Sequence, residues 1–221
     1  MGTQVLEIPF IYRTLEKLGG VPLNLTPMEL VPTVGRGKYT PKRDLFAECV
    51  PILRGESAAV EDIDASNIDG LIIPGGRGAI TVLSDVADSG SDARVVRAVK
   101  DLIVGMHVRN KPIGSIGYGG ALVLISLKHS AEEPIVVLGE DAILISELSS
   151  LGIAPVKVGS QEVVFDQDNV LFSTSGINQE CSIVKGADGV ERLTGAVIEY
   201  CKKKRKKEIT QVRLKDASLD G

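Results

Sequence analysis

The sequence predicts a three-layer α/β domain, in which helices cover both faces of a mostly parallel sheet. Two segments, Asp69–Gly78 and Lys111–Leu122, each read as a buried strand, a glycine turn and the start of a helix. Hydrophobic residues make up 43% of the chain but aromatic residues only 4%, so the core is aliphatic, as in sheets buried on both faces. Ligands of such folds bind where parallel strands end, so the two turns mark a candidate site.

The first half of the chain is predicted to open in a helix and to reach a buried strand. Apolar residues recur at helical spacing in Gly2–Leu18, and Gly19-Gly20 ends this helix. Pro9 fits only if the α-helix begins just before it. The further predictions are a strand at Val21–Leu25, a loop between Pro27 and Pro41, a helix at Asp44–Leu53, an extended piece at Ala58–Val60 and a strand at Gly70–Pro74.

The second half alternates helices with short strands. An apolar stripe predicts a helix at Asp92–Arg109. The further predictions are strands at Pro112–Ile116, Ile135–Leu138, Pro155–Val158, Glu162–Phe165 and Val170–Ser173, and helices at Gly119–Leu127, Asp141–Leu151 and Ile183–Cys201. Residues 1–201 are read as a single domain, and residues 202–221 as a basic, disordered tail.

Composition excludes several classes of function. The net charge of −4 gives no general reason to bind nucleic acid or an acidic membrane, and no apolar run reaches about 18 residues. The three cysteines are an odd number without metal-ligand spacing, so we predict no metal and a reducing compartment, the cytoplasm. The N-terminus lacks the basic start and apolar block of a signal peptide.

The segment Ile72-Ile73-Pro74-Gly75-Gly76, followed by Lys111-Pro112-Ile113-Gly114, resembles the PfpI/parkinsonism-deglycase superfamily of class I glutamine amidotransferase-like proteins. The ElbB-like (sigma cross-reacting protein) branch is the nearer match, from about Gly2 to about Tyr200. The resemblance implies a flavodoxin-like fold, no cofactor and a homodimer. That family has a strand ahead of the first helix, which this chain lacks. We therefore expect the protein to begin upstream of Met1, which would allow an organellar location; the alternative is that another segment or a partner chain fills the slot.

The resemblance also implies a site, and this chain departs from it at one position. The family carries a nucleophilic cysteine on the turn after the second of these strands, where this chain has Gly117. Glu7 matches the family's glutamate beside that cysteine, although it could simply complement a helix dipole. Gly76 and Tyr118 match the backbone donors of the oxyanion hole. The Gly75 turn could serve packing alone.

Four other features are weaker candidates. Arg77 could bind an anion or be a solvated loop residue. Cys181 follows a turn whose family counterpart approaches the pocket, so it either reaches the pocket or, as we favour, is a plain helix-facing cysteine. His107 and His129 have no partner at triad or metal spacing, so both are read as structural. The basic run Lys202–Lys207 is either a solvated helix end or a nuclear-import or nucleic-acid patch.

Three hypotheses for function follow. The first is a non-catalytic ElbB-like homologue that keeps a pocket for a small carbonyl or anionic ligand, because glycine cannot replace a thiolate nucleophile. The second is a glyoxalase-type enzyme that converts glyoxal or methylglyoxal to a hydroxy acid without a cofactor, for example with water activated by Glu7. The third is a nucleotide-binding domain that uses the loop Gly114–Gly120, which only loosely matches a dinucleotide fingerprint.

Overall fold

The computed structural model of the protein has 18 helices and strands among the residues that it describes. These are residues 4–28, 30–32, 42–52, 57–89, 92–139, 145–146, 148, 156, 158–178 and 181–219. The helices are η1 Val5–Glu7, α1 Ile8–Lys17, α2 Leu45–Ile52, η2 Val60–Asp62, η3 Ala65–Asn67, α3 Gly78–Thr81, α4 Val86–Ser89, α5 Arg97–Val108, α6 Gly119–Leu127 and α8 Ile183–Leu219. The strands are β1 Leu25–Thr26, β2 Leu30–Pro32, β3 Lys42–Asp44, β4 Ala58–Ala59, β5 Leu71–Ile73, β6 Ile113–Ile116, β7 Val164–Asp166 and β8 Leu171–Thr174.

A four-stranded sheet with the order β5-β6-β8-β7 forms the centre of the fold. β5, β6 and β8 are parallel, whereas β7 pairs with β8 as an antiparallel hairpin. Two smaller pairs, parallel β1–β4 and antiparallel β2–β3, complete the strand pairing of the described residues. Within that part of the chain, β5 pairs with β6 alone and so forms one edge of the four-stranded sheet.

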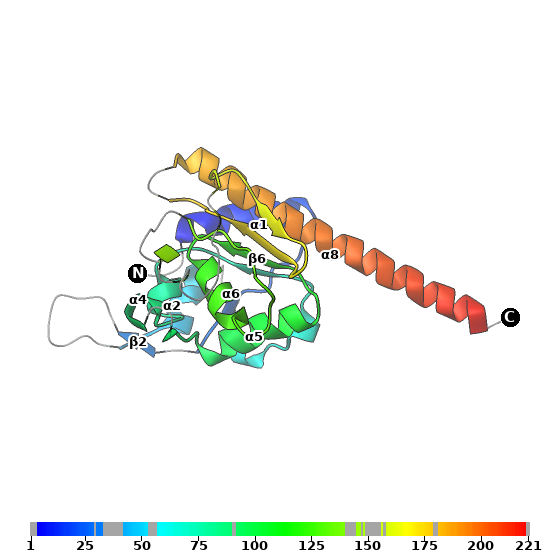
Figure 1. The fold of residues 1–221 in the computed structure, drawn as a ribbon, viewed down its shortest axis with the longest axis horizontal. Helices are drawn as coiled ribbons and strands as arrows, with labels where there is room; N and C mark the ends of the chain where they lie inside the picture. The colour runs from blue at the N-terminus through cyan, green and yellow to red at the C-terminus, as the bar shows by residue number, and fades with distance from the viewer. Residues whose placement is uncertain are drawn as a thin grey trace.

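Helices cover both faces of this sheet, which confirms the predicted three-layer α/β fold. Helices α1 and α8 pack together on one face, and α5 and α6 pack on the other (Figure 1). The apolar cluster under α1 and α8 includes Ile11, Ile116 and Leu193. The cluster under α5 and α6 is larger and includes Ile103, Leu122 and Leu171. No helix among the described residues is both long enough and apolar enough to cross a membrane.

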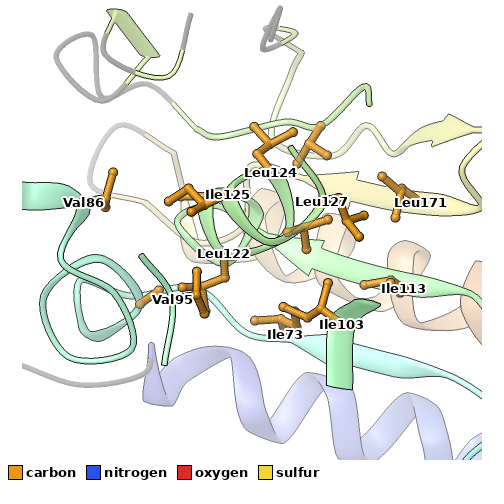
Figure 2. Packing of buried hydrophobic residues seen from close by; sticks show 14 of the residues in the cluster. Ile73, Val86, Val95, Ile103, Ile113, Leu122, Leu124, Ile125, Leu127 and Leu171 are labelled. Carbon is orange, nitrogen blue, oxygen red and sulfur yellow. The ribbon is translucent and has the colours of Figure 1, made fainter. Parts of the chain in front are cut away.

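Helix α6 is the most buried element of the larger cluster. All nine of its residues are buried, and Leu122, Leu124, Ile125 and Leu127 pack among residues of the strands and of α5 (Figure 2). A helix that is apolar on every side is stable only inside a protein, which suits this position. Its first residues must be small, because a Cβ at Gly119 would lie 2.7 Å from the Ile73 carbonyl oxygen. The glycine turn therefore brings α6 directly against the end of β5.

Several predicted boundaries were confirmed. Pro9 lies in the first turn of α1, after the short helix η1, so the α-helix does begin just before it. Gly19 follows α1 with a left-handed φ of 69°. Helix α6 spans the predicted residues, and β7 and β8 form the predicted hairpin around Asp166–Asn169.

Other local predictions were wrong. Helix α5 begins at Arg97 rather than Asp92, because Val95 forms a β-bridge with Ser84. The predicted strand Val21–Leu25 shrinks to Leu25–Thr26, and the predicted loop contains β2. Residues 135–138 form no strand, and the Val137 N–H instead donates to the Ser173 hydroxyl at 3.0 Å. The predicted helix at 141–151 and strand at 155–158 lie largely outside the described residues.

Helix α8 continues to Leu219, so the prediction that it ends at Cys201 was wrong. Its C-terminal part projects from the body of the protein (Figure 1). Lysine, arginine and glutamate are good helix formers, so the basic run extends the helix. The Lys202 ammonium donates to the Leu18 carbonyl at 2.6 Å, and that of Lys204 to the Arg109 and Asn110 carbonyls at 2.8 and 2.9 Å. Two lysines of the run therefore cap the C-terminal ends of α1 and α5.

Candidate functional site

Three turns meet at the carboxyl edge of the sheet, because β5, β6 and β8 are parallel neighbours. They are Pro74–Gly76 after β5, Gly117–Tyr118 after β6 and Ser175–Ile177 after β8. The start of the first helix reaches the same place, where the Gln4 N–H donates to the Gly75 carbonyl at 2.7 Å. We call the group Glu7, Gly75, Gly76, Gly117 and Tyr118 the elbow site.

Glu7 joins two of these turns. It is only 2% exposed although it carries a carboxyl group. Its Oε2 accepts a hydrogen bond from the Gly75 N–H at 2.7 Å, and its Oε1 accepts one from the Ile177 N–H at 3.2 Å. The side chain of Gln4 adds a further link, since its Nε2 donates to the Ile177 carbonyl at 3.0 Å. Glu7 therefore points into the protein and holds the turns after β5 and β8 together.

The buried position changes the acidity of Glu7. Burial raises the pKa of Glu7 from 4.5 to about 7, although hydrogen bonds from the Gly75 and Ile177 N–H groups act in the opposite direction. Desolvation penalises the ionised carboxylate, whereas backbone donors stabilise it. Glu7 therefore exists as a mixture of protonated and ionised carboxyl near neutral pH, which is a property of functional carboxyl groups and of some structural ones.

Glycines make room for the Glu7 carboxyl. A Cβ at Gly75 would lie 3.2 Å from both carboxyl oxygens. A Cβ at Gly176 would lie 2.5 Å from Oε1 and 2.3 Å from the Ile116 Cγ2, and Gly176 also has a left-handed φ of 71°. Neither position tolerates a side chain without movement of its neighbours. The turns therefore fit closely around a carboxyl group at position 7.

Gly117 occupies a sharp turn between β6 and α6. Its φ of 48° is left-handed, and its N–H donates to the Thr174 carbonyl at 2.8 Å. Among the described residues, a Cβ there would meet the Ser175 backbone alone, with the carbonyl oxygen at 3.0 Å. The backbone thus forms the elbow expected at this position, while the residue itself brings no reactive group.

The remaining residues of the predicted site lie at the start of two helices. Gly76 has a positive φ of 108° and is half-buried, and its N–H makes no hydrogen bond within the described residues. Tyr118 is half-buried at the N-cap of α6. Arg77 is exposed at the N-cap of α3, and its side chain has no ion pair in the described part of the chain. The turns thus bring all the candidate residues to one edge of the sheet.

The other candidates lie apart from the elbow. The Cys181 Sγ lies 3.7 Å from the Gly176 carbonyl oxygen, so it contacts the turn behind Glu7. The His107 Nε2 lies 3.2 Å from the Ser130 carbonyl oxygen, which ties α5 to the loop after α6, and His129 is exposed. Among the described residues, no three His, Cys, Asp or Glu side chains gather as metal ligands would.

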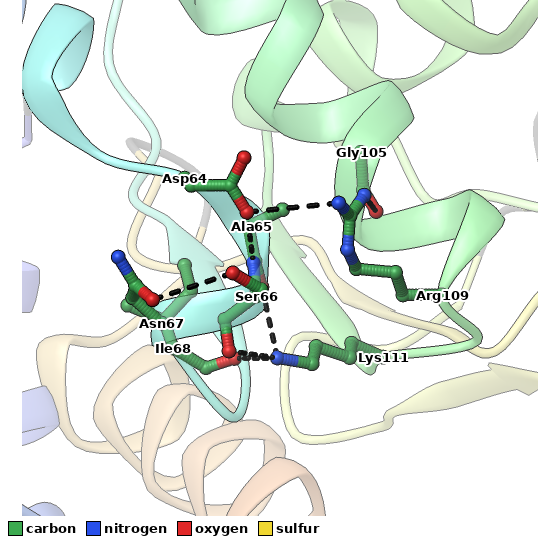
Figure 3. A network of polar contacts seen from close by, with 8 residues as sticks. All are labelled: Asp64, Ala65, Ser66, Asn67, Ile68, Gly105, Arg109 and Lys111. Atoms are coloured by element: carbon green, nitrogen blue, oxygen red, sulfur yellow. Dashed lines mark hydrogen bonds and ion pairs between the residues drawn. The ribbon is translucent and has the colours of Figure 1, made fainter.

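A hollow of about 490 Å³ lies between η2, η3 and α5, and contains no residue of the elbow site. Four of its charged residues form two ion pairs: Arg109 lies 3.6 Å from Asp64, and Arg97 lies 3.4 Å from Asp101. Beside the hollow, the Lys111 ammonium donates hydrogen bonds to the carbonyl oxygens of Ala65, Ser66 and Ile68 (Figure 3). We interpret this network as structural, because it closes the end of η3 and because no described residue that lines the hollow has a buried side-chain polar atom without a partner.

Sequence reasoning missed part of the environment of Glu7. The partners Gln4 and Ile177 were not singled out, because a link across 170 residues has no local pattern. The available signal was the glycine of Ser173-Thr174-Ser175-Gly176, a turn next to a predicted strand end. That glycine indicates a close approach but not which side chain approaches.

Curated relatives match 76% of this chain, whereas no family model matches it. The rat "ES1 protein homolog, mitochondrial" is 28% identical over 178 residues, which cover 76% of this chain and 65% of that protein. The human "glutamine amidotransferase-like class 1 domain-containing protein 3, mitochondrial" is 26% identical over the same length, covering 76% and 64%. The chain thus spans a little under two thirds of the length of these relatives.

Solved structures share the fold. An isoprenoid biosynthesis protein with an amidotransferase-like domain from Ehrlichia chaffeensis has a TM-score of 0.78 and 22% identity, and covers 90% of this chain and 92% of its own. A ThiJ/PfpI domain protein from Brachyspira murdochii has a TM-score of 0.56 and 15% identity, with 91% of each chain covered. The relatives and the shared fold together confirm the predicted resemblance to the PfpI superfamily.

Proposed function

We propose that this homologue of the PfpI superfamily is a non-catalytic member of the ElbB-like branch that binds a small anion or carbonyl compound at the elbow site. The observation that carries the proposal is Gly117. The elbow keeps a left-handed backbone between β6 and α6, but a residue without a side chain stands where the family has its cysteine. Covalent attack on an aldehyde needs a nucleophile, and glycine supplies none.

Ligand binding needs groups that this chain retains. The Gly76 N–H has no partner among the described residues, and with the Tyr118 N–H it would receive a carbonyl or carboxylate oxygen. Arg77, exposed one residue further on, adds a positive charge that favours an anion. These donors belong to the backbone or the rim of the site, so the loss of a cysteine leaves them in place.

The alternative is a glyoxalase-type enzyme, and the pKa of Glu7 is the observation that favours it. A carboxyl group with a pKa of about 7 suits proton transfer at neutral pH. However, both oxygens of Glu7 already accept backbone hydrogen bonds, and the side chain is almost fully buried. Each oxygen could accept a second hydrogen bond, but burial leaves a water molecule little access to the carboxyl, so we favour a positioning role for Glu7.

The nucleotide-binding hypothesis has less support. A Cβ at Gly114 would lie 2.9 Å from Leu193 and 3.0 Å from Val197 of α8, and one at Gly120 would lie 2.6 Å from Val136. These glycines of the loosened fingerprint thus serve packing, Gly114 between β6 and α8 and Gly120 between α6 and the segment around Val136. The expected homodimer and the absence of a cofactor stay predictions, as does a cytoplasmic location; the names of both relatives place those proteins in mitochondria.

An NMR titration with acetate, a small anion that cannot react, tests the proposal. We expect saturable shifts of the Gly76 and Tyr118 amide resonances at millimolar acetate, and weaker binding in Arg77→Gln. The control is Arg192→Gln, which removes an exposed arginine of α8. In parallel, the natural protein should not consume glyoxal. The proposal would be overturned if acetate shifted neither the Gly76 nor the Tyr118 amide resonance, or if the natural protein converted glyoxal.

A further inference from the structure

Phe165 is the one aromatic residue among the exposed large apolar side chains of the described part of the chain, and it is 43% exposed. It lies on β7, which pairs with β8 alone among the described residues. Its ring stacks on that of Phe172, with centroids 4.3 Å apart and planes at 15°, and its centroid lies 6.0 Å from that of Tyr200 of α8. Packing therefore holds the Phe165 ring in place and still leaves much of it in solvent.

Contacts with the body of the protein fix the rotation of α8 beside this aromatic cluster. The Cys201 Sγ lies 3.3 Å from the Asp69 carbonyl oxygen, and the ammonium groups of Lys202 and Lys204 cap the ends of α1 and α5. Residues two apart lie on opposite sides of a helix, because each residue turns the chain by about 100°. Lys203 therefore points away from Cys201 and is exposed to solvent.

The exposed side of the helix continues the aromatic cluster as a line of positive charge. Tyr200, Lys203 and Lys207 share one face of α8, because they follow one another at spacings of three and four residues. Both lysines are exposed, and neither forms an ion pair within the part of the chain that the structure describes. The β7–β8 hairpin lies beside α8 near the point where the helix leaves the body (Figure 1). We call Phe165, Tyr200, Lys203 and Lys207 the α8 row.

We propose that the α8 row binds single-stranded nucleic acid, with a base stacked on Phe165 and phosphates beside Lys203 and Lys207. Every base has a flat π face, and proteins hold single strands by stacking bases on aromatic side chains next to a positively charged track. In a duplex the bases are stacked on one another, so a single strand is the better match. Asp69, which contacts α8 here, precedes β5, so the row lies at the opposite edge of the sheet from the elbow site and is independent of the proposed function.

The net charge of −4 does not oppose this binding, because salt screens exposed charges that lie more than about 10 Å apart at 0.1 M. Close to the row, the six cations of Lys202–Lys207 outnumber the neighbouring carboxylates of Asp69 and Glu199. An anionic membrane is a poorer match. A helix that lies on a membrane needs an apolar face beside its basic face, whereas residues 202–207 are basic on every side.

The probe for the positive charge is a fluorescent oligouridylate of about 12 nucleotides, within the site sizes of single-strand binding proteins. Its binding is followed by anisotropy at a series of salt concentrations. The double variant Lys203→Gln/Lys207→Gln should weaken binding and lower the slope of log affinity against log salt by about 1.4, since each phosphate contact contributes about 0.7. Lys100→Gln/Lys185→Gln is the matched control, which removes two exposed lysines elsewhere and should change neither quantity.

Inorganic polyphosphate tests the stacking, because it carries the charges of a nucleic acid without its bases. Phe165→Leu should weaken oligouridylate binding about fivefold and leave polyphosphate binding, measured by competition, unchanged. Phe10→Leu is the control, since Phe10 is a half-buried ring of α1 outside the row, and unfolding in urea checks that both variants fold. Without any substitution, the natural protein should bind oligouridylate more tightly than the same strand paired with oligoadenylate.

Three results would overturn the inference outright. They are no binding of oligouridylate by the natural protein, binding that the double lysine variant retains in full, and tighter binding to phosphatidylserine vesicles than to oligouridylate. If Phe165→Leu weakened the binding of both polyanions equally or of neither, or if the natural protein preferred the duplex, the assignment to single strands would be wrong. None of these results bears on the acetate titration of the elbow site.

Discussion

The Glu7 carboxyl accepts a 2.7 Å hydrogen bond from the N–H of Gly75, which lies 68 residues further along the chain. The other oxygen of the same carboxyl holds Ile177, 170 residues away. One buried side chain thus connects the first helix to the turns after β5 and β8. Gly117, at the end of β6 between these two strands, shares this edge of the sheet. The shape of the elbow site therefore depends on Glu7 whether or not the protein is a catalyst.

The stability of the protein should fall as the pH rises from about 4.5 to about 7. In the folded chain the Glu7 carboxyl keeps its proton up to about pH 7, whereas in the unfolded chain it ionises near 4.5. Between these values the folded state binds more protons, so the free energy of unfolding decreases with pH. The contribution of this group is up to about 3 kcal/mol. Urea titrations at a series of pH values measure it.

Glu7→Gln should remove this part of the pH dependence, because an amide does not ionise. The control is Glu16→Gln, which changes an exposed glutamate of α1 and should keep the slope of the natural protein. If Glu7→Gln and the natural protein showed the same dependence between pH 5 and 7, the shifted pKa of Glu7 would be disproved.

Gly176→Ala should destabilise the protein strongly, because the new methyl group would lie 2.3 Å from Ile116 and 2.5 Å from Glu7 Oε1. A left-handed φ adds to the steric cost, and together these effects amount to about 3 kcal/mol. In the control, Gly159→Ala, the nearest atom lies at 3.7 Å and φ is not left-handed, so stability should change little. Similar unfolding midpoints in urea for the two variants would contradict the close packing around Glu7.

Lys204→Met should destabilise the protein by about 1 kcal/mol, because it removes an ammonium that caps carbonyls at the end of α5. Lys203→Met is the matched control, since Lys203 is exposed in the same basic run. Chemical unfolding of both variants distinguishes a capping lysine from a solvated one. Equal stability of the two variants would mean that the capping contacts contribute nothing.

The sequence predicts the site better where the signal is local. The turns at Gly75 and Gly117 were found because each follows an apolar strand and precedes a helix, and the end of α1 was found from Gly19. The start of α5 was not, because the pairing of Val95 with Ser84 depends on a neighbour outside the helical pattern. The length of α8 was missed because a polar, charged sequence suits both a helix and a disordered tail.

The elbow site shows the same difference between features with a local sequence signal and features that depend on long-range contacts. Its residues could be placed from a family resemblance, but the burial of Glu7 and its bonds to Gly75 and Ile177 depend on contacts between distant segments. The buried position of Ser175, in the turn after β8, could not be predicted from the sequence, because a serine beside a strand end is common. What distinguishes it is a buried hydroxyl that has no hydrogen-bond partner among the described residues, and burial depends on the fold as a whole.

The most direct test of the central claim is the turnover of glyoxal and methylglyoxal by the natural protein and by Gly117→Cys, compared side by side. The new Cβ would lie 3.0 Å from the Ser175 carbonyl oxygen at a left-handed φ, so the variant carries strain of about 1–2 kcal/mol and its folding is checked first by circular dichroism. The account predicts turnover by the variant alone, because the thiol restores a nucleophile to a site that is otherwise intact. Turnover by the natural protein at the rate of the variant would contradict it.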